Sequence, residues 1–255
     1  MKVELLDYNP DALALLIFTK QTRLQGVQSI DDVKAWPMDK QLEELSYMRD
    51  TIKSSWEFSN YTFNIKGVTR AFTHQLVRTR QASYAQESMR SVDASDHEWL
   101  NTISDKDFHQ RNRFDATCNN MLGQYKIMLD AGVPPQDARG VLPTNILTSI
   151  IMGANLRTLH EMANVRLCTR TQGEYQNVFK AMKAAVVAVH PWADDFIQVY
   201  CANTGICCFP RYDKCPVKAA LASNEHTEFL KQSAKELWEK TEHEAIAIAK
   251  DGRTM

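Results

Sequence analysis

The sequence predicts an α+β fold, built as a helix-rich single domain with a small antiparallel or mixed sheet. Three observations lead to this class. Several segments place apolar residues at helical spacing, and one short stretch near residue 60 alternates apolar and polar residues as a half-buried strand does. Strands and helices do not alternate regularly, as they would in a parallel α/β protein. The length of 255 residues and the hydrophobic share of 44% suit one globular domain.

Two helices are predicted in the N-terminal part of the chain. The first covers residues 9–23, with Asn9 as its cap and Pro10 in its first turn. The second covers residues 39–53, where apolar side chains recur on one side. Acidic residues among the first eleven make a secretory signal unexpected. We therefore expect a cytoplasmic protein without membrane association, bacterial or, if viral, in the cytoplasm of its host.

The period of the pattern then changes. Residues 57–65 predict a strand, because Tyr61, Phe63 and Ile65 alternate with polar residues. Gly67 is expected to end this strand. A short helix to about Arg80 follows, and then an extended segment.

Helices dominate the C-terminal part. Residues 106–131 form a long predicted helix, which Gly132 ends. We expect a catalytic domain over residues 1–200, and a cysteine-containing segment with a C-terminal helix packed on it over residues 201–255. Further helices are predicted over residues 155–168, 173–189 and 224–249.

Glycine spacing excludes two common nucleotide-binding motifs. The closest pair among the nine glycines, Gly132 and Gly140, is eight residues apart. Neither G-x-G-x-x-G nor G-x-x-x-x-G-K-[ST] can therefore occur, which removes the support for a Rossmann site or a P-loop. Any bound nucleotide must be held by side chains and helix ends.

The cysteines allow two interpretations, a zinc or redox cluster or a set of reduced thiols. Four of the six fall within fifteen residues near the C-terminus. No C-x-x-C pair and no histidine at ligand spacing accompany them, so we expect no metal site. Disulfides are not expected in a cytosolic chain. The six are Cys118, Cys168, Cys201, Cys207, Cys208 and Cys215.

Residues 66–90 stand out by charge in a chain whose net charge is -1. They contain five basic residues against one acidic residue, a net charge of +4. Such a run is either a solvated face or a site for an anion, a phosphate or a nucleic acid. In a helix ending near Arg80, Gln75 and Arg78 would share one face.

An extended segment over residues 83–90 would sort its side chains onto two sides. One side then carries an amide, a hydroxyl and a guanidinium in a row, which suits a phosphorylated sugar. A groove for a nucleic-acid polymer would need more basic residues and more aromatic platforms, so a mononucleotide is favoured. The first side is Tyr84, Gln86, Ser88 and Arg90, and the second is Ser83, Ala85, Glu87 and Met89.

The predicted helix over residues 155–166 mixes polar and apolar groups on both sides. Asn155 and Arg166 fall within about 20° of each other around a regular helix. The helix is either a surface helix with an Arg157–Glu161 pair, or one that contacts ligand on more than one side, as where subunits share a site.

Four segments in order resemble the flavin-dependent thymidylate synthase family. QLVRTRQASYAQESMR (75–90) resembles the family signature, an R-H-R-x-x-S core followed by a serine and an arginine. EFSNYTFNIKGVTRAFTHQ (57–75) resembles the strand and helix before it. DARGVLP (137–143) and NLRTLHEMANVR (155–166) resemble two later segments. The likeness covers about residues 50–190 and identifies the chain as a divergent, bacterial or viral member of the family.

This resemblance implies an α+β homotetramer whose active sites are shared between subunits and hold FAD without a Rossmann fold. The implied reaction methylates carbon 5 of dUMP to give dTMP. Methylenetetrahydrofolate supplies the carbon, and NADPH supplies electrons through FAD. The flavin enzymes favour negative charge on the pyrimidine instead of using a cysteine nucleophile, and no Pro-Cys dipeptide occurs here.

The resemblance also implies site residues by position. Arg166 is the expected catalytic residue, because it would stabilise the ionised N3/O4 system of the uracil. Ser88 is assigned to substrate binding. The residues implied to line the dUMP site are Gln75, Arg78, Gln86, Glu87, Ser88, Arg90, Arg139 and Arg166. The residues implied at the flavin are Ser54, Glu57, Arg78, Thr79, Arg80, Gln81, Asn155, Arg157 and Glu161.

Four positions depart from the family pattern. Thr79 stands where the signature has histidine, and it can donate one hydrogen bond but cannot stack or titrate. Ile52 and Phe58 replace histidines, and Glu161 replaces an asparagine or histidine. These departures leave open a related flavoenzyme that adds another one-carbon group, such as hydroxymethyl. The basic stretch over residues 66–90 leaves open an alternative of another class, a non-catalytic nucleic-acid-binding protein.

Overall fold

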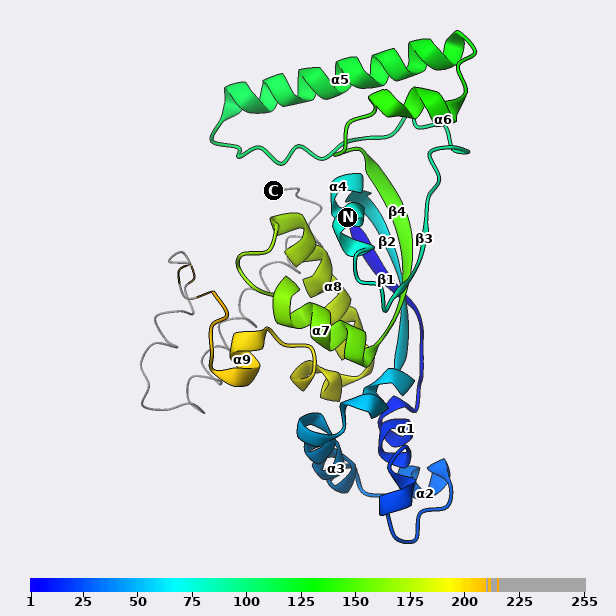
Figure 1. The fold of residues 1–255 in the computed structure, drawn as a ribbon, viewed down its shortest axis with the longest axis vertical. Helices are drawn as coiled ribbons and strands as arrows, with labels where there is room; N and C mark the ends of the chain where they lie inside the picture. Colours follow the sequence, from blue (N-terminus) through cyan, green and yellow to red (C-terminus); the bar gives the residue numbers. More distant parts are fainter. Residues whose placement is uncertain (210, 212–214, 216–255) are drawn as a thin grey trace.

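The computed structural model describes residues 1–209, 211 and 215, and its centre is a four-stranded sheet (Figure 1). The strand order is β1-β2-β4-β3, and every neighbouring pair is antiparallel. The strands are β1 (Lys2–Tyr8), β2 (Asn60–Thr69), β3 (Ser83–Gln86) and β4 (Leu147–Asn155). Together with the helices around it, this sheet confirms the predicted α+β class.

One end of the sheet carries the N-terminal helices (Figure 1). Their capping differs: Ser29 and Asp32 form a reciprocal capping box at α2, whereas the cap of α1 makes no side-chain bond. The elements are α1 (Ala12–Phe18), η1 (Gln21–Arg23), α2 (Ile30–Lys34), α3 (Met38–Thr51) and η2 (Lys53–Phe58).

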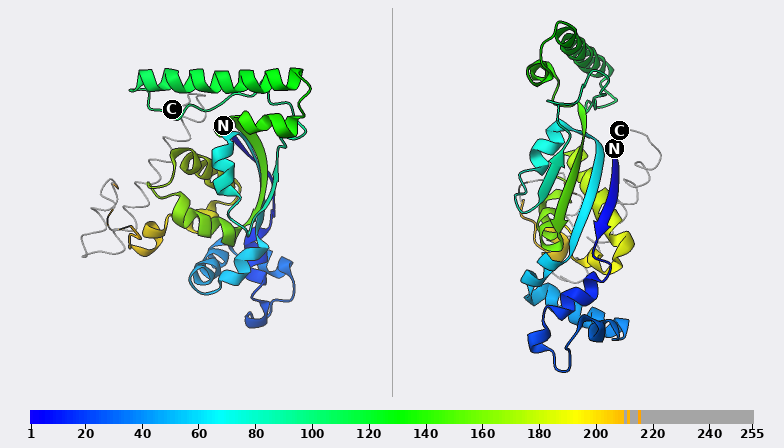
Figure 2. Two further views of the ribbon diagram at one scale, coloured as in Figure 1. Left: turned by 45° about the horizontal axis from the view of Figure 1, so that its top comes forward. Right: turned by 90° about the vertical axis from the view of Figure 1, so that its right-hand side faces the viewer.

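The opposite end carries a long helix that projects beyond the sheet, as both views in Figure 2 show. Of its 23 residues only Cys118 and Tyr125 are buried. A second, small core forms where this helix meets the segment after it. The elements are α4 (Arg70–Leu76), α5 (Phe108–Asp130), α6 (Pro135–Ala138) and η3 (Arg139–Val141).

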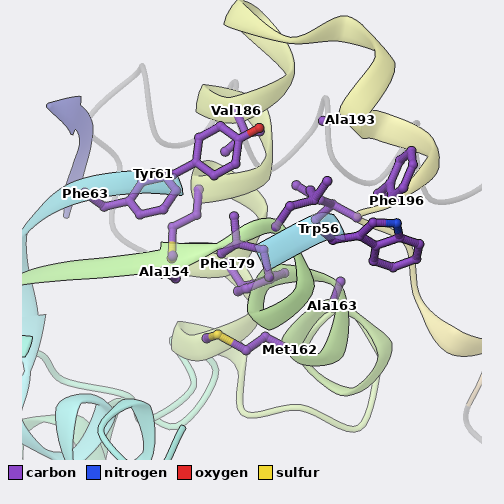
Figure 3. Packing of buried hydrophobic residues seen from close by; sticks show 14 of the residues in the cluster. Trp56, Tyr61, Phe63, Ala154, Met162, Ala163, Phe179, Val186, Ala193 and Phe196 are labelled. Carbon is purple, nitrogen blue, oxygen red and sulfur yellow. The ribbon is translucent and has the colours of Figure 1, made fainter. Parts of the chain in front are cut away.

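The remaining helices cover one face of the sheet and make the main core (Figures 1 and 3). Alternate residues of β2 and β4 point into this core, where they meet buried side chains of α7 and α8. Figure 3 shows Tyr61 and Phe63 of β2 beside Phe179 and Val186. The elements are α7 (Leu156–Arg166), α8 (Gly173–Val189), η4 (Pro191–Asp195) and α9 (Tyr200–Thr204).

The other face of the sheet is not covered by the described part of this chain. On β4 the residues between the buried ones are exposed or half-buried, and Ile151 is 42% exposed. None of the described helices has both the length and the apolar character required to cross a bilayer.

The structure confirms the helices predicted over residues 39–53, 106–131, 155–168 and 173–189, within a few residues at their ends. The helix predicted over 224–249 lies outside the described residues. The helix predicted over 9–23 ends early, at Phe18. Asn9 does not cap it, because its side-chain oxygen accepts a hydrogen bond from the backbone of Asn60 at 2.7 Å instead.

The predicted strand over 57–65 is β2, but its bounds were wrong at both ends. Residues 57 and 58 belong to η2. Gly67 does not end the strand, because it adopts φ +64° inside a bulge between Lys66 and Val68, and pairing continues to Thr69. The following helix ends at Leu76, not near Arg80.

Candidate functional site

The turn after α4 is held by a half-buried tyrosine from β3. The single hydrogen of the Tyr84 hydroxyl is shared between the carbonyl oxygens of Leu76, at 2.8 Å, and Thr79, at 3.0 Å. Burial raises the pKa of Tyr84 to about 12. A second tie runs from the Gln86 amide to the Thr73 hydroxyl at 2.9 Å. The backbone of the charged segment is therefore fixed from two points on β3.

Arg166, at the end of α7, lies over an aromatic ring of α8. Its guanidinium carbon is 4.3 Å from the ring centroid of Tyr175. Tyr175 is 0% exposed and packs edge-to-face on Phe72 at 4.9 Å. Burial raises the pKa of Tyr175, and the charge of Arg166 partly offsets this. The ring thus presents the half-buried Arg166 on a rigid support.

The Tyr175 hydroxyl connects this support to the α4–β3 turn. It lies beside Thr79 and Arg166, which both lower its pKa, although neither is placed for a full hydrogen bond. Tyr84 is near enough for Tyr175 to affect its titration. The structure therefore brings Thr79 and Arg166 together, two residues that are far apart in the sequence.

The start of α8 is fastened to the start of α4. Glu174 accepts hydrogen bonds from the backbone N–H of Thr69 at 2.7 Å and from its hydroxyl at 2.6 Å. The same hydroxyl accepts from the backbone of Phe72 and caps α4. Gln75 donates to Gln172 at 2.6 Å. These contacts fix α4, which lies at the start of the charged segment, against α8, which carries the Tyr175 ring under Arg166.

A second basic group lies near Glu87. Arg70 donates to the Glu87 carbonyl oxygen at 3.5 Å. Burial, and then the neighbouring charge of Arg139, lowers the pKa of the Arg70 guanidinium. The half-buried Arg70 guanidinium, beside a second positive charge, lies where an anion would stabilise it. Arg70 belongs to the charged run, but the sequence analysis did not assign it to the site.

The Glu87 carboxylate is used within the chain. It accepts from the Thr148 hydroxyl at 3.2 Å and the Ser149 backbone at 3.1 Å, and His97 lies 3.3 Å away. The carboxylate thereby ties the end of β3 to β4. The predicted alternation puts Glu87 on the opposite side of the extended segment from Gln86, and this contact agrees with that prediction.

The predicted row of side chains beyond β3 was only partly right. Strand β3 ends at Gln86, so Tyr84 and Gln86 share a half-buried side but the alternation stops there. Ser88 and Arg90 lie in an exposed turn, in which the Ser88 hydroxyl accepts from the Arg90 backbone at 3.3 Å. Met89 between them is buried, which fixes the turn.

A third group gathers at the other end of α7. Arg157 donates to Glu57 at 2.6 Å and to Glu161 at 3.3 Å, and these carboxylates raise its pKa. The Asn155 side-chain oxygen caps α7 by accepting from Thr158 at 2.9 Å, which leaves its amide hydrogens available. Arg157 and Arg166 are about 14 Å apart along the helix axis. Helix α7 therefore separates two polar sites, one at each end.

The remaining expected site residues are not brought into these groups. All of them are exposed to solvent in the described chain, where a ligand or a second chain can reach them. They are Ser54, Arg78, Arg80, Gln81, Ser88, Arg90 and, apart from its effect on Arg70, Arg139.

The fold and these groups define a class: a small-sheet α+β protein that would hold an anionic nucleotide with arginines, without a glycine-rich loop. The family model described as "Thymidylate synthase complementing protein" matches residues 4–192. The chain belongs to this family.

Relatives and a solved structure agree with this assignment. The chain is 32% identical to the flavin-dependent thymidylate synthase of Sulfolobus acidocaldarius over 75% of this chain and 74% of that protein. It is also 32% identical to the one of Geobacter sulfurreducens, over 75% of this chain and 84% of that protein. A crystal structure of the Helicobacter pylori enzyme ThyX, complexed with FAD and dUMP, has a TM-score of 0.61 at 20% identity. It covers 78% of this chain and 100% of that chain, and shows the shared fold.

Proposed function

We propose that this chain is an enzyme that methylates dUMP to dTMP, with FAD as cofactor and methylenetetrahydrofolate and NADPH as co-substrates. The observation that carries the proposal is the family match over residues 4–192, which includes both the charged segment and α7. The relatives in this family are named for this FAD-dependent synthase activity.

The phosphate of dUMP is assigned to the basic group near Glu87. Burial and the charge of Arg139 disfavour the charged state of Arg70, so a phosphate dianion bound beside it would stabilise that charge. We assign Arg90 and Ser88, in the exposed turn after β3, to this subsite as a third guanidinium and a hydroxyl donor. Gln75, Arg78 and Gln86 are assigned to the remainder of the dUMP site, and Glu87 is assigned to hold the end of β3 against β4.

Arg166 is assigned to the uracil ring. A cation beside N3 and O4 favours the electron-rich form of the base, and in a desolvated site this stabilisation amounts to a few kcal/mol. The Tyr175 ring, whose centroid lies 4.3 Å from the guanidinium carbon of Arg166, holds this group in place. Ser88 binds substrate only, because a serine without a neighbouring base is a weak nucleophile.

The residues assigned to FAD fit a diphosphate-bearing group. Arg78 and Arg80 are exposed cations on the turn after α4, and the amide hydrogens of Asn155 remain free to donate. Arg157 is already paired with Glu57 and Glu161, so this group offers hydrogen bonds to a polar ring edge instead of net positive charge. These residues would hold FAD, which would supply redox chemistry to the site. Ser54, Thr79 and Gln81 complete the assigned set.

A homotetramer with shared sites explains why so many assigned residues are exposed. The uncovered face of the sheet and α5, with Phe108 66% and Ile127 60% exposed, offer apolar surface for other copies. We assign residues 1–200 to the catalytic domain and residues 201–255 to a segment packed on it. We place the enzyme in the cytoplasm of a bacterium or of the host of a virus.

The test is a spectrum followed by product analysis. The purified protein should show flavin absorbance, and NADPH with dUMP should bleach it. Adding methylenetetrahydrofolate should yield dTMP, identified by a mass gain of one methyl group. A product that carries a hydroxymethyl group would show instead that the enzyme catalyses the alternative reaction. A colourless protein that FAD cannot reconstitute, and that binds oligonucleotides with steep salt dependence, would refute the enzyme proposal.

A further inference from the structure

The turn that we assign to the substrate phosphate is part of a loop over residues 87–97, and the chain at both ends of this loop is hydrogen-bonded to β4. At the first end, the Glu87 backbone N–H donates to the Ser149 carbonyl oxygen at 3.0 Å. Just beyond the second end, the Leu147 N–H donates to the Glu98 carbonyl oxygen at 2.8 Å. In Figure 1 the segment after β3 runs toward α5 and α6. The base of the loop is therefore fixed.

The inner side of the loop packs on α5. Met89 is 4% exposed and Ala94 is 0% exposed, and both belong to the second core together with Tyr125 of α5. The Tyr125 hydroxyl accepts a hydrogen bond from the Ala94 backbone N–H at 3.3 Å. Ser88 and Arg90, on either side of Met89, are exposed. The loop thus has a packed inner side and an outer side that carries the two side chains assigned to the phosphate.

A side-chain contact of His97 links the two ends of the loop. Its Nε2 lies 3.3 Å from Oε1 of Glu87. An ionised carboxylate has no hydrogen to donate, so the imidazole Nε2 carries the hydrogen whether the ring is neutral or charged. The side chains of His97 and Glu87 are only 19% and 25% exposed, so the contact is largely shielded from water. It therefore differs from a fully solvated surface pair, which contributes little.

Glu87 connects His97 to the rest of the proposed phosphate subsite. Its other carboxylate oxygen accepts from the Thr148 hydroxyl at 3.2 Å and from the Ser149 backbone N–H at 3.1 Å. Its backbone carbonyl oxygen accepts from the Arg70 guanidinium at 3.5 Å. A change in the orientation of Glu87 would therefore affect the subsite on two sides, at Arg70 and at the exposed turn that follows in the chain.

We propose that His97 is a positioning residue for the phosphate subsite: by donating to Glu87 it closes the loop and holds Ser88 and Arg90 where a phosphate dianion can bind. This inference rests on the proposed function, which assigns these two side chains to dUMP. His97 acts through Glu87 and not through contact with the nucleotide. Without its side chain, the loop keeps its backbone contacts and its packing on α5. The loss therefore falls on dUMP binding, because the outer side of the loop must then be ordered when the ligand binds.

The experiment compares two replacements of His97 in the full-length protein with FAD. His97→Phe keeps a planar ring but removes the donor, and we expect the Kd and KM for dUMP to rise about ten-fold while kcat stays within about two-fold. His97→Gln keeps an N–H donor and should stay within about three-fold of wild type. The matched control is His109→Phe, at an exposed histidine of α5, which should bind dUMP as the wild type does. A phenylalanine variant with wild-type affinity for dUMP, or a glutamine variant that loses as much, overturns the proposal.

A double-mutant cycle separates positioning from general damage. Arg90→Ala removes a side chain that His97 is proposed to place. Adding His97→Phe to this variant should therefore weaken dUMP binding by less than about two-fold further. An equal loss with and without the Arg90 guanidinium would mean that His97 does not act through this turn, which also overturns the proposal.

The wild type distinguishes failure of this inference from failure of the proposed function. Wild-type protein that neither binds dUMP nor forms dTMP refutes the proposed function, and this inference with it. Wild-type protein that does both, beside a phenylalanine variant that binds dUMP equally well, refutes the inference alone. If the phenylalanine variant fails to fold, hydrogen exchange of the wild type decides. Saturating dUMP should slow exchange of the backbone amides over residues 87–97 at least about three-fold, and unchanged exchange there overturns the proposal.

Discussion

Replacing the aromatic support under Arg166 tests the most specific feature of the site. Tyr175→Leu keeps an apolar side chain of moderate size but removes the ring that lies 4.3 Å from the guanidinium carbon of Arg166. Tyr175→Phe is the matched control, because it keeps the ring and removes only a hydroxyl that has no full hydrogen-bond partner. The pair separates the effect of the ring from that of the polar atom.

The size of the effect follows from the surroundings of the contact. A cation over an aromatic face contributes about 0.5–1 kcal/mol when exposed and about 2 kcal/mol when desolvated. Tyr175 is fully buried and Arg166 is half-buried, so we expect about 1–2 kcal/mol. That corresponds to a loss of about 5–30-fold in kcat/KM for the leucine variant. The phenylalanine variant should remain within about two-fold of wild type.

The assay is the rate of dTMP formation at varied dUMP, with flavin content and melting temperature measured for each variant. A double-mutant cycle with Arg166→Ala separates positioning from general damage, because Tyr175→Leu should cost almost nothing once the guanidinium is gone. Wild-type kcat/KM in the leucine variant would refute the reasoning. So would a phenylalanine variant that loses as much as the leucine variant.

Three further predictions concern single groups. Arg166→Ala should fold normally but lose orders of magnitude in turnover, and near-normal dTMP formation would show that another group stabilises the uracil. Glu174→Ala removes both acceptors of the buried Thr69 and should lower the free energy of unfolding in urea by about 1–3 kcal/mol, with an unchanged urea midpoint as the contrary result. Burial lowers the pKa of His160 and His190 from 6.5, so the unfolded chain takes up protons first as the pH falls. The free energy of unfolding should therefore decrease below about pH 6.5, and a flat profile between about pH 7.5 and 5.5 would contradict this.

The elements that the sequence predicted well are those with a long, clean helical period. The helix over residues 173–189 agrees with α8 at both ends. The strands β1 and β4 were missed. The core side of β4 includes small or polar residues such as Thr148 and Ala154, which hide the alternation. In β1, a bulge between Leu5 and Asp7 shifts the pattern.

The site was predictable only where the charge run and the family resemblance name its residues. Arg166 and Gln86 could be expected from the sequence, whereas Tyr175 could not, because its contact with Arg166 depends on how α8 packs beside α7. The surroundings of Cys168 could not be predicted for the same reason. Cys168 is far in sequence from Cys201, and only the fold packs both against the main core.

The packing of α8 beside α7 also concerns Thr79, which stands where the family signature has histidine. The Thr79 carbonyl accepts from Tyr84, and its side chain lies beside the buried Tyr175 hydroxyl. A histidine there would have to share this space with the ring that supports Arg166, and close-packed interiors do not absorb such a change without shifting neighbours. The small threonine is therefore compatible with a large aromatic residue at 175. It follows that the threonine at position 79 bears on the placement of Arg166, the proposed catalytic residue, as well as on the proposed contacts to the flavin.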